Sequence, residues 1–87
     1  MFFLYILRSE STGKYYIGTT KNIATRLAQH NAGGTSSTKR YRPWKLVHTE
    51  AFGTLREARQ REKQIKSWKN PAYMVKTLGI GSEQVGT

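Results

Sequence analysis

The sequence predicts a small domain of the α/β (α+β) class, with its elements in the order β-β-α-β-α-α. Three runs are rich in apolar, aromatic or β-branched residues, and three further segments begin at residues that cap or start helices. The length of 87 residues leaves room for one domain.

The first predicted strand covers residues 2–8, an apolar and aromatic run without polar alternation. Such a run is typical of a strand that is covered on both faces, so we expect it to be central in its sheet. Turn-forming residues separate it from residues 15–19, and the two runs are predicted to form a hairpin. After a long loop over residues 33–43, residues 44–52 predict a third strand of mixed pattern.

The helices are predicted from their starting residues. Asn22 and Thr54 are suited to capping the first two helices, and Pro71 suits the first position of the third. The predicted helices cover residues 23–31, 55–69 and 71–78. We therefore expect a folded domain over residues 1–78 and a flexible tail over residues 79–87.

The composition restricts the chemistry. The chain has 15 lysines and arginines against 5 acidic residues, all of them glutamate, and it has no cysteine. These counts exclude disulfides, cysteine–zinc sites, thiol nucleophiles and aspartate dyads. The net charge of +10 indicates an anionic partner, with nucleic acid ahead of a membrane surface. A basic surface without a specific ligand is the alternative.

The apolar run at the start of the chain is too short to cross a bilayer, which requires about 20 residues. No basic residues precede it, as they would in a signal peptide. We expect a soluble, cytoplasmic protein without a membrane partner.

Arg26 and His30 are four residues apart and flank the apolar face that Ile23 and Leu27 define on the first predicted helix. A cation and an imidazole beside a core-facing stripe indicate a functional pair. The alternative is an arginine whose stem covers the core and a histidine at the helix end. The residues alone leave both interpretations open.

Glu62 falls between Leu55 and Ala58 on a wheel of the second predicted helix, inside its apolar stripe. A charged carboxylate that faces the core is costly unless it is paired or binds a metal. An ion pair with Arg59 or Lys66 would explain an exposed glutamate well but an inward one badly. Because of this burial cost we favour a functional Glu62. The other four glutamates fall in turns, strand ends, the tail or a solvent-facing helix surface, so we expect only Glu62 to point inward.

Tyr5 and Tyr16 lie on the two strands of the predicted hairpin. With Arg26, His30 and Glu62 they form a set of ionisable or hydroxyl-bearing groups at inward positions. Arginine neutralises charge on a phosphoryl oxygen, and tyrosine or histidine accepts a proton from an attacking water. One carboxylate with several waters commonly holds Mg²⁺ beside a substrate phosphate. The set therefore predicts metal-assisted hydrolysis of a phosphodiester.

Three motifs make the sequence resemble the GIY-YIG nucleases. Tyr16-Ile17-Gly18 matches the second half of their signature, and Phe3-Leu4-Tyr5 stands in place of the first half. Arg26-Leu27-Ala28-Gln29-His30 resembles the Arg-x-x-x-His/Tyr helix of the family. The segment Arg61–Trp68 resembles the metal-glutamate helix of the small, stand-alone bacterial branch, which is similar to the catalytic domain of the Slx1 structure-specific endonucleases. The resemblance runs from about Phe2 to Leu78.

The resemblance implies a three-stranded antiparallel sheet with flanking helices and a central first strand. It implies that Tyr5 or Tyr16 is the general base, with the choice open, and that Arg26 binds the scissile phosphate. His30 would assist proton transfer or activate a tyrosine. Glu62 would be the sole protein ligand of one divalent metal, Mg²⁺ or Mn²⁺.

A second set of residues is basic, with an interleaved aromatic residue, as expected for contacts with a nucleic-acid backbone and with unpaired bases. Its members are Lys39, Arg40, Tyr41, Arg42 and Lys45 in the long loop and third strand, and Lys63 and Lys66 on the second helix. Trp44 lies among them, but we expect its large ring to be in the core.

The function that we predict is a metal-dependent DNA endonuclease, acting on branched, nicked or single-stranded DNA in repair or recombination. The expected partners are DNA and, from the resemblance, a larger repair protein, and the expected state is a monomer or weak dimer. The alternatives are a nucleic-acid-binding module that does not cut, or a recruitment domain that docks onto a repair protein.

Overall fold

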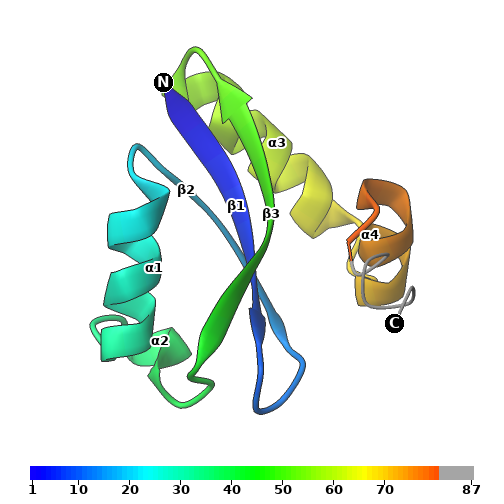
Figure 1. The fold of residues 1–87 in the computed structure, drawn as a ribbon. Coiled ribbons are helices and arrows are strands. Elements are labelled where there is room, and N and C mark those ends of the chain that lie inside the picture. Colours follow the sequence, from blue (N-terminus) through cyan, green and yellow to red (C-terminus); the bar gives the residue numbers. More distant parts are fainter. Residues whose placement is uncertain (81–87) are drawn as a thin grey trace.

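The computed structural model of the protein describes residues 1–80 as a three-stranded antiparallel sheet with helices on both faces (Figure 1). The strands are β1 (Phe2–Ser9), β2 (Tyr15–Thr20) and β3 (Trp44–Phe52), in the order β2-β1-β3. The helices are α1 (Ile23–Ala32), α2 (Ser36–Lys39), α3 (Leu55–Ser67) and α4 (Pro71–Leu78). The fold class and the central position of the first strand are confirmed.

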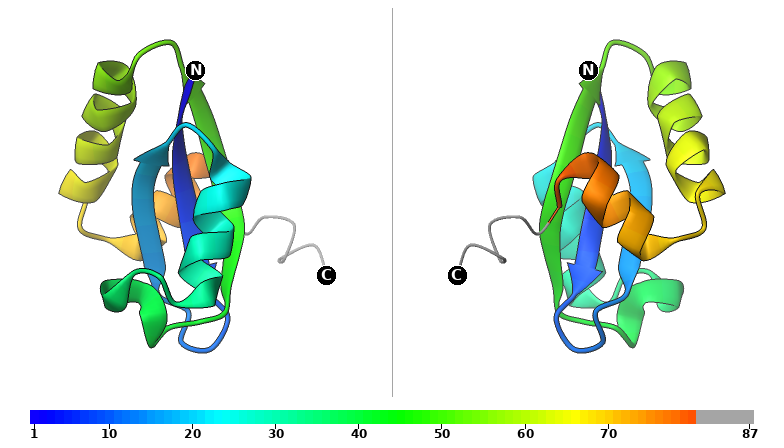
Figure 2. Two further views of the ribbon diagram at one scale, coloured as in Figure 1. Left: turned by 90° about the vertical axis from the view of Figure 1, so that its left-hand side faces the viewer. Right: turned by 90° about the vertical axis from the view of Figure 1, so that its right-hand side faces the viewer.

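Two separate cores lie on the two faces of β1, because its side chains alternate between the faces. Leu4 and Ile6 pack towards α3 and α4, whereas Tyr5 and Leu7 pack with Trp44 on the other face. Figure 2 shows α1 covering one face of the sheet and α4 the opposite face. The buried position predicted for Trp44 is confirmed.

The helix starts follow the predicted caps. The side-chain oxygens of the predicted caps Asn22 and Thr54 accept hydrogen bonds from backbone N–H groups in the first turns of α1 and α3. Pro71 is the first residue of α4, as predicted, and Asn70, which was not predicted as a cap, accepts in the same way from the N–H of Tyr73. The end of the second predicted helix was placed two residues late, since α3 ends at Ser67. Lys69 adopts a positive φ of 51°, which breaks the helical path before α4 begins.

The segment predicted as one long loop contains the additional short helix α2. Contacts from distant residues hold this segment in place. The indole N–H of Trp44 donates to the Thr38 carbonyl at 2.9 Å, and the Ser9 hydroxyl donates to the Tyr41 carbonyl at 2.7 Å. The Asn31 side chain pairs with both backbone groups of Trp44. Local sequence signals do not report such long-range contacts.

Gly79 ends α4 with a φ of 72°, and the side chain of Ile80 is buried against Leu4 and Ile6. These two residues of the predicted tail therefore pack onto the domain. The remainder of the predicted tail, residues 81–87, lies outside the described residues. Within residues 1–80, no helix has the length and apolar character that crossing a membrane would require.

Candidate active site

A cleft of about 480 Å³ opens beside the β2 edge of the sheet, between α1 and α3. It brings together four of the five predicted site residues, Tyr5, Tyr16, Arg26 and Glu62. The other lining residues are Gly18, Thr19, Arg59, Lys63 and Lys66. Glu62 is the only carboxylate among the described residues of this lining, and it faces four cationic side chains.

His30 lies behind Tyr5 and completes a chain of hydrogen bonds. The Tyr5 hydroxyl is 3.1 Å from His30 Nε2, and His30 Nδ1 is 2.9 Å from Thr38 Oγ1. The Thr38 hydroxyl donates to the Thr35 carbonyl at 3.3 Å, so its oxygen accepts from the Nδ1–H of His30. This assignment leaves Nε2 as the acceptor of the Tyr5 proton.

Burial keeps both partners of this hydrogen bond neutral. Desolvation, and to a smaller extent the nearby Arg26 charge, lower the pKa of His30 below its ordinary 6.5. Desolvation raises the pKa of Tyr5 to about 12, with a further contribution from Tyr16 and an opposing one from Arg26. At neutral pH, therefore, a neutral phenol donates to a neutral imidazole.

Gly18 makes room for this phenol. It pairs with Tyr5 across the β1–β2 ladder, and a Cβ atom at position 18 would lie 2.6 Å from the Tyr5 hydroxyl oxygen. Real side chains do not approach this closely, so the Tyr5 hydroxyl can occupy its place only beside a glycine.

The Tyr16 ring forms one wall of the site. Its centroid lies 4.7 Å from that of His30 and 6.2 Å from that of Tyr5. It also contacts the buried Trp44 ring edge-on, at 6.3 Å between centroids. Tyr16 therefore packs against the aromatic rings that position the Tyr5–His30 hydrogen bond.

Arg26 presents an unused donor. Its Nη1 group donates to Gln29 Oε1 at 3.2 Å, but its Nε–H is buried and has no hydrogen-bond partner among the described residues. A buried donor without a partner is costly, which favours an acceptor supplied by a ligand. A phosphate oxygen has the charge and geometry that a guanidinium binds best.

Glu62 is less inward than its sequence pattern indicated. Its side chain is 21% exposed and forms an ion pair with Lys66, with Nζ 2.7 Å from Oε2. The expectation that no other glutamate turns inward was wrong. The Glu50 side chain is 22% exposed and pairs with Arg61 and His48, each at 2.8 Å. Glu62 is distinguished by its place in the cleft rather than by its burial.

The cleft offers one carboxylate to a metal. Residues 1–80 contain no group of three or more histidine and glutamate side chains that would enclose an ion. The Lys66 ammonium already rests against Oε2 of Glu62, so this oxygen accepts a cation where it stands. A single carboxylate completed by waters and substrate oxygens is a common arrangement for Mg²⁺.

The predicted DNA-binding residues fall into two groups. Lys63 and Lys66 line the cleft. The exposed residues Lys39, Arg40, Arg42 and Lys45 lie around α2 and the start of β3, outside the cleft. The Tyr41 ring is already covered by Lys14 Nζ at 5.0 Å and by the Arg40 guanidinium at 5.9 Å. These cations lower the pKa of Tyr41.

Two residues at the site, Thr38 and Arg59, were not predicted as site residues from the sequence. Thr38 is 2% exposed and orients His30, but its sequence neighbours are small and polar, as in an ordinary loop. Arg59 lines the cleft but was considered only as a pairing partner for Glu62. No local signal would have identified Thr38, because its contact with His30 depends on how α2 folds back over α1.

The chain is similar to a known domain family and to several proteins. A family model described as the GIY-YIG catalytic domain matches residues 1–76. A UPF0213 protein of Bacillus pumilus is 39% identical over 67 residues, covering 76% of this chain and 67% of the relative. A UPF0213 protein of Syntrophus aciditrophicus is 46% identical over 66 residues, covering 74% and 75%. The solution NMR structure of a UPF0213 protein from Bacillus halodurans has 33% identity and a TM-score of 0.46, covering 77% of this chain and 72% of that chain.

Proposed function

The chain belongs to the GIY-YIG catalytic domain family, and from this premise we propose that it is a metal-dependent DNA endonuclease. The observation that carries the proposal is the convergence of three chemical parts at one cleft. These parts are the Tyr5–His30 hydrogen bond, the unpaired Nε–H of Arg26 and the Glu62 carboxylate. Together they supply what phosphodiester hydrolysis requires: a proton acceptor, a phosphate contact and a ligand for a cation.

Proton transfer in this proposal passes through Tyr5. A phenol with a pKa of about 12 is not ionised at neutral pH, so it cannot act as a free phenolate base. Instead, the Tyr5 oxygen accepts a proton from the attacking water while its own proton moves to Nε2 of His30. Thr38 accepts from Nδ1–H and keeps the imidazole oriented as it becomes charged.

Arg26 and Glu62 act on the phosphate side of the reaction. The Nε–H of Arg26 donates to a non-bridging oxygen while a P–O bond to the water oxygen forms and the bond to the leaving oxygen breaks. The leaving oxygen takes its proton from solvent. Glu62 would hold Mg²⁺ or Mn²⁺, which when bound supplies charge stabilisation at the phosphoryl and leaving oxygens.

The charge of the lining supports DNA as the substrate. Arg59, Lys63 and Lys66 line the cleft, and further exposed basic residues lie around α2. Such contacts neutralise a phosphate backbone without reading its sequence. We propose branched, nicked or single-stranded DNA as the substrate class, in repair or recombination.

The test compares two glutamates of nearly equal exposure. Purified wild-type protein is incubated with flap, fork, nicked and single-stranded DNA, with Mg²⁺ or Mn²⁺. We expect E62Q to lose at least about 100-fold in cleavage rate, because metal and charge stabilisation contribute several kcal/mol. The matched control E50Q removes the same charge at a carboxylate outside the cleft and should retain activity.

Equal cleavage by wild type and E62Q would mean that the activity is not that of this site.

One observation favours a second candidate, a module that binds nucleic acid without cutting it. The Lys66–Glu62 ion pair neutralises the carboxylate that would repel a phosphate. DNA binding that survives EDTA, with no cleavage of any structure tested, would support that module. A pull-down with and without nuclease treatment would separate a repair-protein partner from a DNA bridge.

A further inference from the structure

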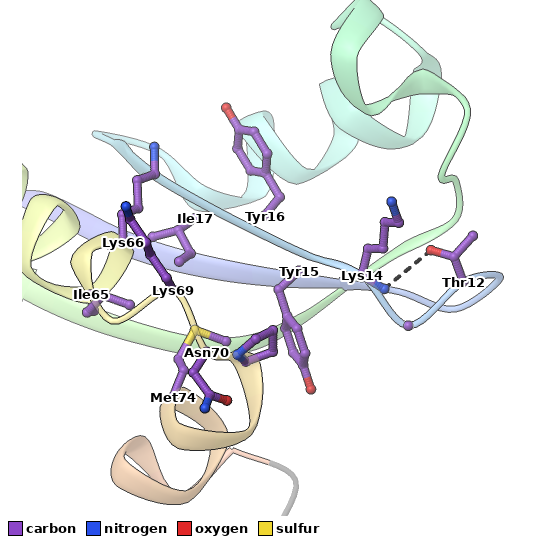
Figure 3. Close-up of a pocket in the computed structure, with 12 residues that line it drawn as sticks. Thr12, Lys14, Tyr15, Tyr16, Ile17, Ile65, Lys66, Lys69, Asn70 and Met74 are labelled. Carbon is purple, nitrogen blue, oxygen red and sulfur yellow. Dashed lines mark hydrogen bonds between the residues drawn. The ribbon is translucent and has the colours of Figure 1, made fainter.

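A second cavity, of about 600 Å³, lies between the β1–β2 turn, β2, the end of α3 and the start of α4 (Figure 3). Its apolar lining comes from Tyr15, Ile17, Ile65, Pro71 and Met74. Its polar lining includes Lys14, Lys66 and Lys69, and no carboxylate lies among the described residues around it. A ligand that fits this lining combines an apolar, planar or compact body with negative charge.

The cavity lies next to the candidate active site. Tyr16 and Lys66 line both, one from β2 and one from α3. Figure 3 shows that Tyr15 and Tyr16 leave β2 in opposite directions, with the Tyr16 ring pointing away from the cavity. Strand β2 is at the edge of the sheet. An extended polymer that is bound in the cleft and passes around this edge would therefore enter the cavity.

From these observations we propose that the cavity seats an unpaired nucleotide of the DNA strand that is cut. The base would rest on the apolar lining with the Tyr15 ring as its stacking partner, and the adjacent phosphates would contact Lys66 and Lys69. A base that is paired in a duplex is not free to enter. This inference rests on the proposed function and narrows its substrate class to DNA with an unpaired segment near the cleavage point.

Lys69 provides an independent reason to assign a ligand here. Its φ of 51° lies in the left-handed region, at the end of α3, where glycine is the favoured residue. Lysine is more strained than glycine in this conformation. The backbone conformation alone therefore does not explain why position 69 is a lysine. Its side chain lines the cavity, so contact between the ammonium group and a bound anion would be a reason for lysine at this position.

The strain at Lys69 also makes a sharp variant available. We expect K69G to raise the melting temperature, because glycine adopts this φ freely, and at the same time to weaken binding to a flap oligonucleotide. K76A is the matched control, since it removes one positive charge from an exposed position of α4 that does not line the cavity. We expect K69G to bind the flap at least about threefold more weakly than K76A.

A scan of abasic sites tests whether a base binds in the cavity. Fluorescence anisotropy in EDTA measures the binding of labelled flap oligonucleotides in which one base at a time is removed. For wild type we expect about tenfold weaker binding when the missing base is at one or two positions near the flap junction. Y15L keeps an apolar side chain in the lining but lacks the ring, so the scan with Y15L should be flat.

A flat scan with wild-type protein would overturn the inference, as would K69G binding as tightly as K76A. Unchanged DNA affinity in Y15L together with a flat wild-type scan would show that the cavity does not hold a base. Because binding is measured in EDTA, the result does not depend on cleavage. A wild type that cleaves but scans flat contradicts only this inference, and one that scans as expected but never cleaves contradicts only the nuclease activity.

Discussion

The Tyr5 hydroxyl is held in place from two sides. His30 Nε2 accepts its hydroxyl proton at 3.1 Å, and on the other side the missing side chain of Gly18 leaves the space that the hydroxyl occupies. The position of one oxygen atom therefore depends on a residue of β2 and a residue of α1. Changes of a single methyl group at these contacts test the site more closely than truncation of the tyrosine.

Substituting Gly18 with alanine should separate this contact from general effects on the fold. In G18A the new Cβ would lie 2.6 Å from the Tyr5 hydroxyl oxygen, so the ring must move and its hydrogen bond to His30 is lost. We expect cleavage to fall at least about tenfold and stability to fall by about 1–3 kcal/mol, measured by nuclease assay and urea unfolding. G53A is the control, because its Cβ meets only Glu57 Oε1 at 3.7 Å. Full activity in G18A would refute the role of this contact.

Thr38 is expected to act through His30 as a positioning residue. T38V keeps the shape of the side chain but removes the acceptor of the His30 Nδ1–H, whereas T38S retains it. We expect T38V to lose about tenfold or more in cleavage rate and T38S to remain close to wild type. Nitrogen-15 NMR of the imidazole should show the Nδ1–H tautomer in wild type and T38S, and a mixture in T38V. An unchanged tautomer in T38V would contradict this assignment.

Residues within motifs were predictable from the sequence, and residues placed by the fold were not. The spacing of Arg26 and His30 was enough to put both on one side of α1. Thr38 gave no signal, and the inward position of Glu62 was overstated, because a helical wheel shows direction but not depth. Glu50, at a strand end, is as buried as Glu62 because Arg61 and His48 cover it.

At the scale of elements, α3 joins the two cavities through one side chain. Lys66 is paired with Glu62 one turn earlier, and it lines both the cleft and the second cavity. A cation that approaches Glu62 must compete with this ammonium group. The helix therefore carries both the carboxylate and the positive charge that occupies it.

This competition predicts that K66M binds Mn²⁺ more tightly than wild type. The Lys66 side chain is 54% exposed, so solvent screens the ion pair and we expect a gain of only about threefold to fivefold. Titration calorimetry or the electron paramagnetic resonance signal of free Mn²⁺ would measure the affinity. K76M controls for the change in net charge and should bind as wild type does. Weaker binding by K66M would show that Glu62 is not the site of the ion.

Helix and strand positions followed from local chemistry, with one exception. The predicted bounds of β3 and α4 coincide with those observed, because Trp44, Phe52 and Pro71 mark clear changes in residue type. Helix α2 is stabilised instead by Trp44 of β3, whose indole N–H donates to the Thr38 carbonyl, and Ser9 of β1 holds the Tyr41 carbonyl just after the helix. A prediction from local propensity does not include contacts that exist only after the sheet has formed.

At the scale of the whole molecule, the raised pKa of Tyr5 couples the site to stability. Between pH 10 and about 12 the unfolded chain releases the Tyr5 proton while the folded chain retains it. The contribution of Tyr5 to the free energy of unfolding is therefore fully present below pH 10 and is lost as the pH rises towards 12. His30 acts in the opposite range, since its lowered pKa means that stability falls as the pH drops below 6.5.

The effect of Tyr5 ionisation at alkaline pH is tested by comparing how steeply the free energy of unfolding changes with pH, rather than its absolute value. Y5F lacks the ionisable group, so between pH 10 and pH 12 its free energy of unfolding should fall by about 2 kcal/mol less than that of wild type. Y73F, which alters a ring that is 51% exposed, should follow the wild-type profile. Urea unfolding at a series of pH values gives both profiles. Parallel profiles for Y5F and wild type would show that Tyr5 does not retain its proton in the folded state.

The two cores on either side of β1 differ in composition and in their relation to the candidate active site. One face holds Tyr5, Tyr16 and the other aromatic residues of the candidate active site, and the other holds aliphatic residues such as Leu4, Ile6 and Ile65. Substitutions at Leu4 and Ile6, which line neither cavity, can therefore change the stability of the aliphatic core without altering the lining of either cavity. A change in melting temperature can in this way be separated from a change at the candidate active site.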